Sequence, residues 1–293
     1  MKPRISVVIP TYNYGHYLPA AVESVRAQGW PDLEIIVVDD GSTDDTPRVM
    51  KELAGDDLRY IRQENAGPAA ARNRGIRESS GEWIAFLDAD DLWMPEKLAV
   101  QMDELQKHPD ASFSYTDTRV RFPDGTERDV KCEPAGNNLL LKLLTGNQFS
   151  TPTVVVRRQC FLKVGQFEAE LRTGEDWDMW LRLAAHFEGV YVARPLALVR
   201  REFNPAKYPL PVLEQCTMRV MKRLFACTYI RQHRPEVLSK KRRAYAWQYS
   251  VLAKSYLKSR CIGAFCRLAF KSVAAHPAAL GYLIGRRAQL SDG

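Results

Sequence analysis

The 293-residue chain is 45% hydrophobic, so it can bury a substantial core, as expected for one large domain with an appendage. No apolar run approaches the ~18 residues of a membrane-spanning helix, and the start, MKPRISVVIP, lacks the features of a signal peptide, which argues against a membrane-spanning or secreted protein. The net charge of +7 is unevenly spread: residues 219–293 hold 16 Lys and Arg against two acids, whereas residues 1–218 hold 26 against 33. The opposite charges predict different tasks for the two parts.

The first hundred residues alternate between apolar strands and helices. Strands are predicted at 5–10, 33–42, 57–63 and 82–91, and helices at 17–28, 44–54 and 65–79. Near-continuous apolar strands between amphipathic helices favour an α/β fold, with a mostly parallel sheet and helices on both faces.

The middle of the chain is less regular. A turn is predicted at 123–125, a loop at 132–138, a strand at 151–158 and a helix with acids in its first turn at 174–187. From about residue 210 the pattern is helical and is interrupted by prolines. We therefore predict an α/β domain over residues 1–209 and a basic, helical C-terminal region over residues 210–293.

Polar side chains follow the predicted strands at their carboxyl ends, which meet at one edge of a parallel sheet where ligands bind. They fall into three groups: residues 10–13, Asp39 with Asp40, and residues 88–91. The last group has three aspartates within four positions. Such concentrated charge requires a counter-charge, for which a divalent cation is one candidate.

The six cysteines show neither CxxC pairs nor a metal-ligand spacing with histidine. Reduced thiols are therefore expected rather than a disulfide framework. This expectation favours the cytoplasm as the compartment.

Five segments, in order and at the right spacing, resemble family 2 glycosyltransferases. They are VVIPTYNYGHYLPAAVESVRAQ, EIIVVDDGSTDDT, NAGPAAARNRGI, GEWIAFLDADD and GEDWDMWLRLA. The resemblance covers about residues 4–200. It implies the Rossmann-like GT-A fold and an inverting transfer of sugar from a nucleotide donor, for which UDP is favoured, to a hydroxyl of a glycan or lipid-linked acceptor.

Asp88-Ala89-Asp90 resembles the D-x-D element of that family. The resemblance implies Mg²⁺ or Mn²⁺, with Asp90 as a metal ligand and Asp88 touching the metal and the ribose or sugar. Alternation along an extended segment would point Asp88 and Asp90 the same way. The alternative is an exposed acidic turn in which Asp91 caps the next helix.

The resemblance also implies a nucleotide site. Asp40 is expected to accept the imide N–H of uracil, whereas Asp39 braces the loop. The remaining residues expected near the nucleotide are Pro10, Thr11, Tyr12, Asn13, Arg72, Asn73, Asp88 and Ala89. The competing interpretation of Asp39 and Asp40 is a polar turn with helix-capping residues, and that of Arg72 and Asn73 is an exposed helical face.

The family pattern assigns the general base to Asp176, which would take the proton of the acceptor hydroxyl. Glu175 is expected to orient the acceptor. Trp177 is expected either to contact the acceptor or to pack in the core, and Asp178 is expected to point into solvent. Many relatives have a histidine after this helix, but residues 197–208 have none, so Arg200 or Arg201 is expected to meet the diphosphate instead.

The basic region after residue 210 interleaves cations with aromatic residues. Three interpretations stay open: a solvated positive face, peripheral contact with an anionic membrane at its inner face, and nucleic-acid binding, which is the least favoured. For the whole chain, a catalytically inactive nucleotide-sugar-binding or scaffold protein is the main alternative. A two-carboxylate sugar hydrolase is disfavoured because it needs no nucleotide site.

Overall fold

The structure is a computed structural model that describes residues 2–132, 138–201 and 209–284, and the chain forms two compact units. The first unit comprises Met1–Asn137, Gln148–Leu171 and His186–Phe203, and the second comprises Asn138–Asn147, Arg172–Ala185 and Asn204–Gly293. The second unit thus includes two segments that precede residue 209. The predicted domain boundary stays a prediction, and the loop predicted at 132–138 lies largely outside the described residues.

The first unit is built on one sheet, whose described strands follow the order β3-β2-β1-β4-β8-β6-β9-β5, with β7 paired to β6. The strands are β1 (Ile5–Thr11), β2 (Leu33–Asp39), β3 (Leu58–Arg62), β4 (Trp83–Phe86), β5 (Leu92–Trp93), β6 (Ala111–Arg121), β7 (Glu127–Val130), β8 (Val155–Arg157) and β9 (Glu188–Arg200). The first four strands pair in parallel, as do β6 and β9, whereas β8 is antiparallel to both β4 and β6.

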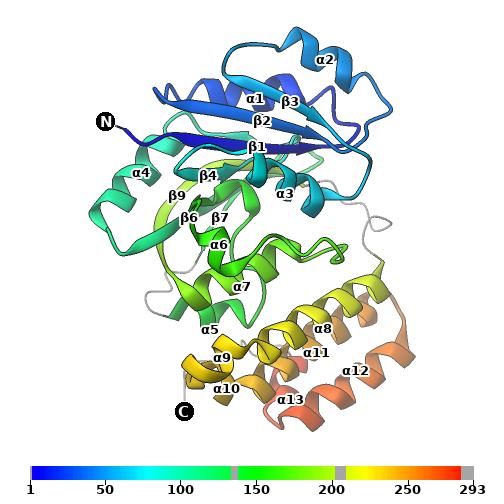
Figure 1. The fold of residues 1–293 in the computed structure, drawn as a ribbon. Helices are drawn as coiled ribbons and strands as arrows, with labels where there is room; N and C mark the ends of the chain where they lie inside the picture. Colours follow the sequence, from blue (N-terminus) through cyan, green and yellow to red (C-terminus); the bar gives the residue numbers. More distant parts are fainter. Residues whose placement is uncertain (1, 133–137, 202–208, 285–293) are drawn as a thin grey trace. The chain divides into compact units, whose positions relative to one another are not determined.

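Helices pack on both faces of the sheet (Figure 1). The helices of the first unit are α1 (Leu18–Arg26), α2 (Thr46–Glu52), α3 (Pro68–Glu78), α4 (Lys97–Lys107) and α6 (Cys160–Val164), with a 3₁₀ turn at Thr151–Thr153. Along β2, Ile35 and Val37 join the cluster that contains Val22 of α1, whereas Ile36 and Val38 pack with Ala71 of α3. Burial of alternate side chains on opposite faces explains why the strands are almost continuously apolar.

Helix α3 lies very close to strand β1. A Cβ atom added to Gly75 would stand 2.2 Å from a methyl carbon of Val8, nearer than atoms can pack. Glycine at this position therefore allows the close approach of helix and sheet.

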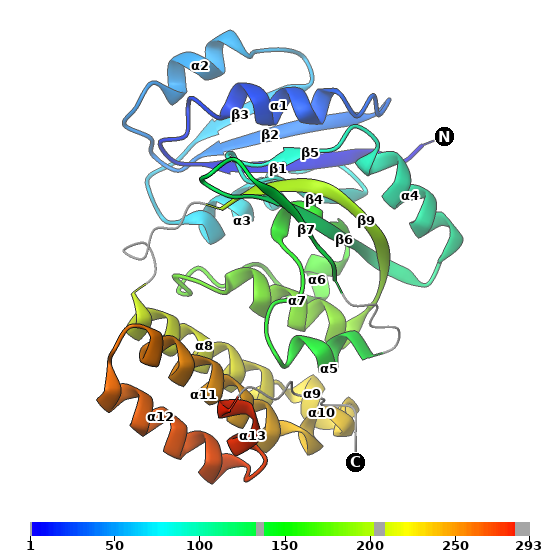
Figure 2. The same cartoon turned by 180° about the vertical axis from the view of Figure 1, so that it is seen from behind.

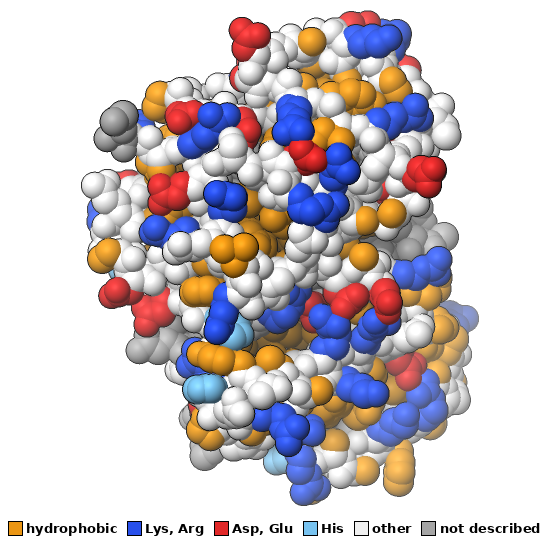
Figure 3. Space-filling view, viewed as in Figure 1, with side chains coloured by type: hydrophobic (Ala, Val, Ile, Leu, Met, Phe, Trp, Pro, Cys, Tyr) orange, Lys and Arg blue, Asp and Glu red, His pale blue; other side chains and the backbone are white. Residues whose placement is uncertain are grey.

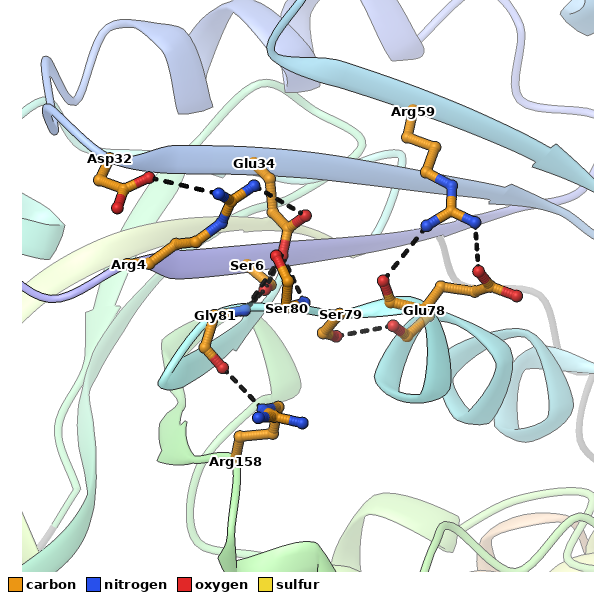
Figure 4. Close-up of polar contacts among 11 residues, drawn as sticks. Arg4, Ser6, Asp32, Glu34, Arg59, Glu78, Ser79, Ser80, Gly81 and Arg158 are labelled. Carbon is orange, nitrogen blue, oxygen red and sulfur yellow. Dashed lines mark hydrogen bonds and ion pairs between the residues drawn. The ribbon is translucent and has the colours of Figure 1, made fainter.

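The amino-terminal ends of β1, β2 and β4 are joined by the Glu34 carboxylate (Figure 4). Its Oε1 accepts hydrogen bonds from the Ser6 hydroxyl and from both the backbone N–H and the hydroxyl of Ser80. Burial raises the pKa of Glu34, but these hydrogen bonds and the Arg4 charge outweigh it and lower the pKa overall. This cluster stabilises the edge opposite to the one where ligands are expected.

Two long strands, β6 and β9, run side by side in parallel (Figure 2), and the sequence pattern did not predict either of them. The single strand predicted at 151–158 was too long, because Thr151–Thr153 forms a 3₁₀ turn and only Val155–Arg157 pairs. Pro152 cannot donate a ladder hydrogen bond, which explains the late start of that strand.

The second unit consists of helices in its described part. They are α5 (Leu139–Leu143), α7 (Glu175–His186), α8 (Leu210–Ala226), α9 (Thr228–His233), α10 (Pro235–Ser239), α11 (Lys241–Lys258), α12 (Ile262–Ala275) and α13 (Ala279–Leu283). Two side chains of α11, Trp247 and Gln248, donate hydrogen bonds to the carbonyls of Thr145 and Leu144, directly after α5. In the described ranges, no helix has the length and apolar character needed to cross a membrane.

Candidate active site

The carboxyl ends of β1, β2 and β4 meet at one edge of the first unit. Thr11 at the end of β1 pairs with Asp39 at the end of β2, and Val8 pairs with Phe86 shortly before Asp88. The three predicted groups of polar residues therefore gather at the same edge of the sheet.

Asp39 and Asp40 are both buried, and each holds neighbouring backbone in place. Asp39 accepts hydrogen bonds from the Ser42 N–H (2.8 Å) and the Tyr60 hydroxyl (2.5 Å). Asp40 accepts three hydrogen bonds from the segment after β3: the side-chain amide of Gln63 at 2.7 Å and the backbone N–H groups of Ala66 and Gly67 at 2.9 and 2.7 Å. Burial and the Asp39 carboxylate raise the pKa of Tyr60, so its hydroxyl keeps the proton that it donates.

Asn13 connects the end of β1 to the loop after β2. Its backbone has a φ of 57°, a left-handed conformation that asparagine tolerates better than most residues. The side-chain oxygen of Asn13 accepts a hydrogen bond from the Thr43 N–H at 2.7 Å, and the backbone N–H of Asn13 donates one to the Ser42 hydroxyl. Nearby, Tyr12 is 46% exposed, whereas Pro10 is buried within β1.

Residues 88–91 form a turn after β4, in which the Asp91 N–H donates to the Asp88 carbonyl. The prediction that Asp88 and Asp90 alternate along an extended segment is therefore wrong, because Ala89 and Asp90 form the bend. Asp91 is buried, and burial together with the charges of Asp88 and Asp90 raises its pKa well above the ordinary value. The turn therefore gathers three carboxyl groups within four residues, and the buried one is the least inclined to carry charge.

Arg72 and Asn73, both buried on α3, reach different partners. The Arg72 guanidinium pairs with the Asp88 carboxylate at 2.7 Å, so it offsets part of the charge of the turn. The Asn73 side-chain amide donates to the Phe167 carbonyl and accepts from the Phe167 N–H, each at 2.8 Å. Asn73 therefore fixes the 165–171 segment, and its contact with nucleotide stays a prediction.

Arg200, at the end of β9, lies beside the acidic turn. Its backbone N–H donates to the Asp91 carboxylate at 2.9 Å, and its guanidinium is 5.2 Å from the centre of the Tyr17 ring. The buried Arg200 Nε and the buried Thr11 hydroxyl have no hydrogen-bond partner among the described residues. Arg201 is exposed, and the segment that follows it, 202–208, lies outside the described residues.

Asp176 lies in the first turn of α7, in the second unit. Its Oδ2 accepts a hydrogen bond of 2.6 Å from the Asn147 side chain, and its Oδ1 accepts one of 2.7 Å from the Trp177 N–H. The side chain is half-buried, whereas the neighbouring Glu175 is buried. The two hydrogen bonds thus hold the carboxylate in a defined orientation at the N-terminus of α7.

The prediction for Asp178 was wrong, because this residue is buried instead of solvated. Its two oxygens bind Arg182 on the same helix, at 2.8 Å, and Arg223 of α8, at 3.1 Å. Two guanidinium groups satisfy the buried carboxylate, which the one-dimensional pattern did not reveal. Trp177 is 6% exposed, and its indole N–H donates a hydrogen bond to the Leu143 carbonyl. Of the two expectations for this residue, the structure therefore fits packing in the core.

The residues of the acidic turn fit a divalent cation of the Mg²⁺ or Mn²⁺ type. Among the described side chains, no group of three His, Cys, Asp or Glu could hold a metal by itself. Mg²⁺ in nucleotide enzymes is typically bound by one or two carboxylates, with phosphate oxygens and water completing the shell. Asp88 and Asp90 supply such hard oxygen ligands, and a cation between them would offset the repulsion between carboxylates two residues apart.

Three residues of these networks were not singled out from the sequence: Tyr60, Gln63 and Asn147. Each donates a hydrogen bond to a predicted carboxylate that lies 21, 23 or 29 residues away in the sequence, respectively. A polar residue on a strand or in a loop carries no local signal of such a contact, so the fold was needed to find them.

Comparison with known proteins decides the family. Residues 6–164 match Glycosyl transferase family 2. The chain belongs to this family. The match covers more than half of the chain, and it includes the edge formed by Thr11, Asp40 and Asp88.

Relatives of this family 2 chain include a putative teichuronic acid biosynthesis glycosyltransferase, TuaG, of Bacillus subtilis, which is 33% identical over 187 residues, 62% of this chain and 72% of that protein. An uncharacterized glycosyltransferase of Rickettsia bellii is 31% identical over 215 residues, 70% of this chain. The chain spans only about a third of the length of some of these relatives: 31% of the Rickettsia bellii protein and 30% of an uncharacterized glycosyltransferase of Rickettsia felis.

Solved structures share the fold of this family 2 chain. S. aureus TarS 1–349 has a TM-score of 0.61 at 17% identity, with 93% of this chain and 92% of that one covered. The mannosyltransferase PcManGT from Pyrobaculum calidifontis, in complex with GDP-Man and Mn²⁺, has a TM-score of 0.60 at 18% identity, over 97% and 88% of the two chains. The predictions of a family 2 glycosyltransferase and of the GT-A fold are thereby confirmed.

Proposed function

We propose that this chain is an inverting glycosyltransferase that moves a sugar from a UDP-linked donor to a hydroxyl of a glycan or lipid-linked acceptor. The observation that carries the proposal is the shared edge of β1, β2 and β4, where Asp39, Asp40 and the 88–91 turn meet. Membership of the family supports the reaction class. TarS 1–349 has been solved with UDP-GlcNAc and with UDP, which favours a UDP donor here.

The donor is expected to lie along this edge. Asp40 would accept the uracil imide N–H in addition to the contacts that fix its carboxylate, and Thr11 to Asn13 would form the wall against the base. Arg200 or Arg201 would pair with the diphosphate.

Asp88 and Asp90 would hold Mg²⁺ or Mn²⁺. When bound, the cation supplies positive charge that stabilises the departing diphosphate. Arg72 keeps Asp88 oriented through their ion pair, so the position of that ligand is fixed before donor binding. In PcManGT the complex contains Mn²⁺, which supports a metal of this kind.

Asp176 would act as the general base that takes the proton of the acceptor hydroxyl. The hydrogen bond from Asn147 to Oδ2 orients the carboxylate. Glu175 would position the acceptor. Because a hydroxyl is a poor nucleophile until its proton is removed, loss of this base should affect transfer far more than donor binding.

The donor assignment is tested by thermal shift of the whole chain with UDP, ADP and GDP, each with and without Mn²⁺. We expect UDP with Mn²⁺ to raise the melting temperature most, because a ligand that binds only the folded chain stabilises it. Equal shifts for the three nucleotides would reject the assignment. Asp90→Asn should remove the Mn²⁺-dependent part of the shift.

The base is tested by Asp176→Asn, which should lower transfer at least ~100-fold and leave the UDP shift unchanged. Loss of both would assign Asp176 a structural role. Donor binding by the wild-type chain without transfer to any glycan or lipid-linked hydroxyl would instead support the alternative, an inactive nucleotide-sugar-binding or scaffold protein.

We also propose peripheral contact of the basic C-terminal helices with the inner face of an anionic membrane, where lipid-linked acceptors are found. The uneven charge supports this proposal, since 16 Lys and Arg follow residue 218 against two acids. A cytoplasmic location goes with this proposal and stays a prediction.

A further inference from the structure

Helix α12 has an apolar side that faces away from its own core. Leu268 and Ser272 are buried towards α11, where the Ser272 hydroxyl donates to the Ala246 carbonyl. On the other side, apolar side chains recur at intervals of four, four and three residues, which places them along one face of the helix. These residues, called here the α12 outer face, are Ile262, Cys266, Phe270 and Val273.

The α12 outer face is exposed to an unusual degree. Phe270 is 76% exposed and Ile262 is 56% exposed, and in α13 and directly after it Leu280 and Ile284 are 60% and 73% exposed. A surface helix normally presents polar residues to water. Hydrophobic side chains lie beside Lys and Arg over the region of this helix in Figure 3. A row of exposed apolar side chains along one helix face is a candidate binding surface.

Cations, and no acids, accompany this face along the chain. Lys258, the last residue of α11, and Arg260, in the turn that follows, are both exposed shortly before Ile262, and the exposed Lys271 follows Phe270. Between residues 237 and 284 the sequence has nine Lys and Arg and no Asp or Glu. Arg267, also on α12, is paired with Glu214 of α8, so it contributes less to the field than the exposed cations.

We propose that the α12 outer face inserts into the interfacial layer of a membrane that contains anionic lipids, with Phe270 as the main apolar anchor and Lys258 and Arg260 at the headgroups. The proposal deepens the membrane contact proposed above by naming the surface that makes it. Apolar residues beside cations suit a leaflet that offers acyl chains below anionic headgroups.

Charge argues against other occupants. A second copy of the chain would bring a face with the same cations and no acids, so symmetric pairing would place like charges together. A nucleic acid would use the cations but would leave Phe270 and Ile262 unsatisfied, except where an aromatic ring stacks on a base. A leaflet uses both features.

The test is flotation of the full-length chain with vesicles of phosphatidylcholine, alone or with about 30% phosphatidylglycerol. We expect strong recovery with the anionic vesicles and weak recovery with the neutral ones. Phe270→Ser should lower partitioning into anionic vesicles about tenfold, the effect of withdrawing one aromatic side chain from an apolar phase. The matched control is Leu162→Ser on α6, which removes a 90% exposed leucine of the first unit and should change nothing.

Two further variants separate the contributions. Lys258→Glu with Arg260→Glu should abolish the difference between anionic and neutral vesicles. Equal recovery of the wild type with both vesicles, or unchanged partitioning of Phe270→Ser, would overturn the proposal. The proposal would also be overturned if the wild type were a dimer that Phe270→Ser converts to a monomer, or if nuclease treatment abolished the binding to vesicles. Flotation needs no nucleotide, so the membrane proposal can hold even if UDP causes no thermal shift. Phe270→Ser should retain the UDP-dependent thermal shift of the wild type.

Discussion

Asn73 offers a direct test of how the 165–171 segment is held. Its amide satisfies both backbone groups of Phe167, at 2.8 Å each, and both residues are buried, with exposures of 7% and 3%. Asn73→Ala would remove two hydrogen bonds from buried backbone groups of Phe167. Each such hydrogen bond contributes about 1–1.5 kcal/mol, so the expected loss in free energy of unfolding is about 2–3 kcal/mol.

The loss can be measured by urea denaturation followed by circular dichroism, with hydrogen exchange at the Phe167 amide as a local probe. The matched control is Arg77→Ala. Arg77 also connects α3 to this segment, by donating to the Gln166 side chain, but that contact is exposed, so the expected change is below about 0.5 kcal/mol. A loss for Asn73→Ala as small as that of the control would refute the reasoning.

Asn73→Asp adds a signature in pH. The new carboxylate could still accept from the Phe167 N–H, but its second oxygen would face the Phe167 carbonyl. Protonation restores a donor there, so the folded-state pKa of the new group should be raised, and the destabilisation should shrink as the pH falls from 8 towards 5. A destabilisation independent of pH would contradict this account.

Three other substitutions test the packing of buried groups. Burial lowers the pKa of Lys97, so at a pH below the ordinary pKa of lysine the folded chain binds fewer protons than the unfolded chain, and the free energy of unfolding should rise from pH 7 to pH 10. Lys97→Met should remove that rise, as thermal melts at the two pH values would measure. An equal rise in the variant and the wild type would contradict this account. A glycine-to-alanine change normally stabilises a helix, but at Gly75 the clash with Val8 should lower the free energy of unfolding by about 1–3 kcal/mol. The loss should be smaller in a Val8→Ala background, which a double-mutant cycle would measure. Asp178→Asn should destabilise the second unit by about 2 kcal/mol in urea, because it weakens a buried carboxylate's pairing with Arg223; an unchanged midpoint would show that the pair contributes nothing.

The first half of the fold was predictable because its strands are buried on both faces. Ile35 to Val38 are all buried, so the sequence shows one apolar run that ends in Asp39 and Asp40. Strand β6 lacks that signal, since polar residues such as Ser114 and Thr116 are buried in it alongside aromatic ones.

The candidate site divides in the same way. The carboxylates at strand ends could be named from the sequence, because chain order alone puts them at one edge. Their supporting partners could not, since Tyr60 and Asn147 reach Asp39 and Asp176 only after folding. The error at Asp178 has the same origin: whether an acid in a first turn meets water or a guanidinium depends on what packs against the helix.

The hydrogen bonds made by Asp40 and Asn13 have a thermodynamic consequence. The backbone at Ala66, Gly67 and Thr43 is already fixed by these two side chains. A ligand that arrives at this edge therefore meets a rigid rim, so association should proceed with little loss of chain entropy. Amide protons of these loops should already exchange slowly in the ligand-free chain, and the heat-capacity change on binding should reflect only the surface that the ligand itself covers.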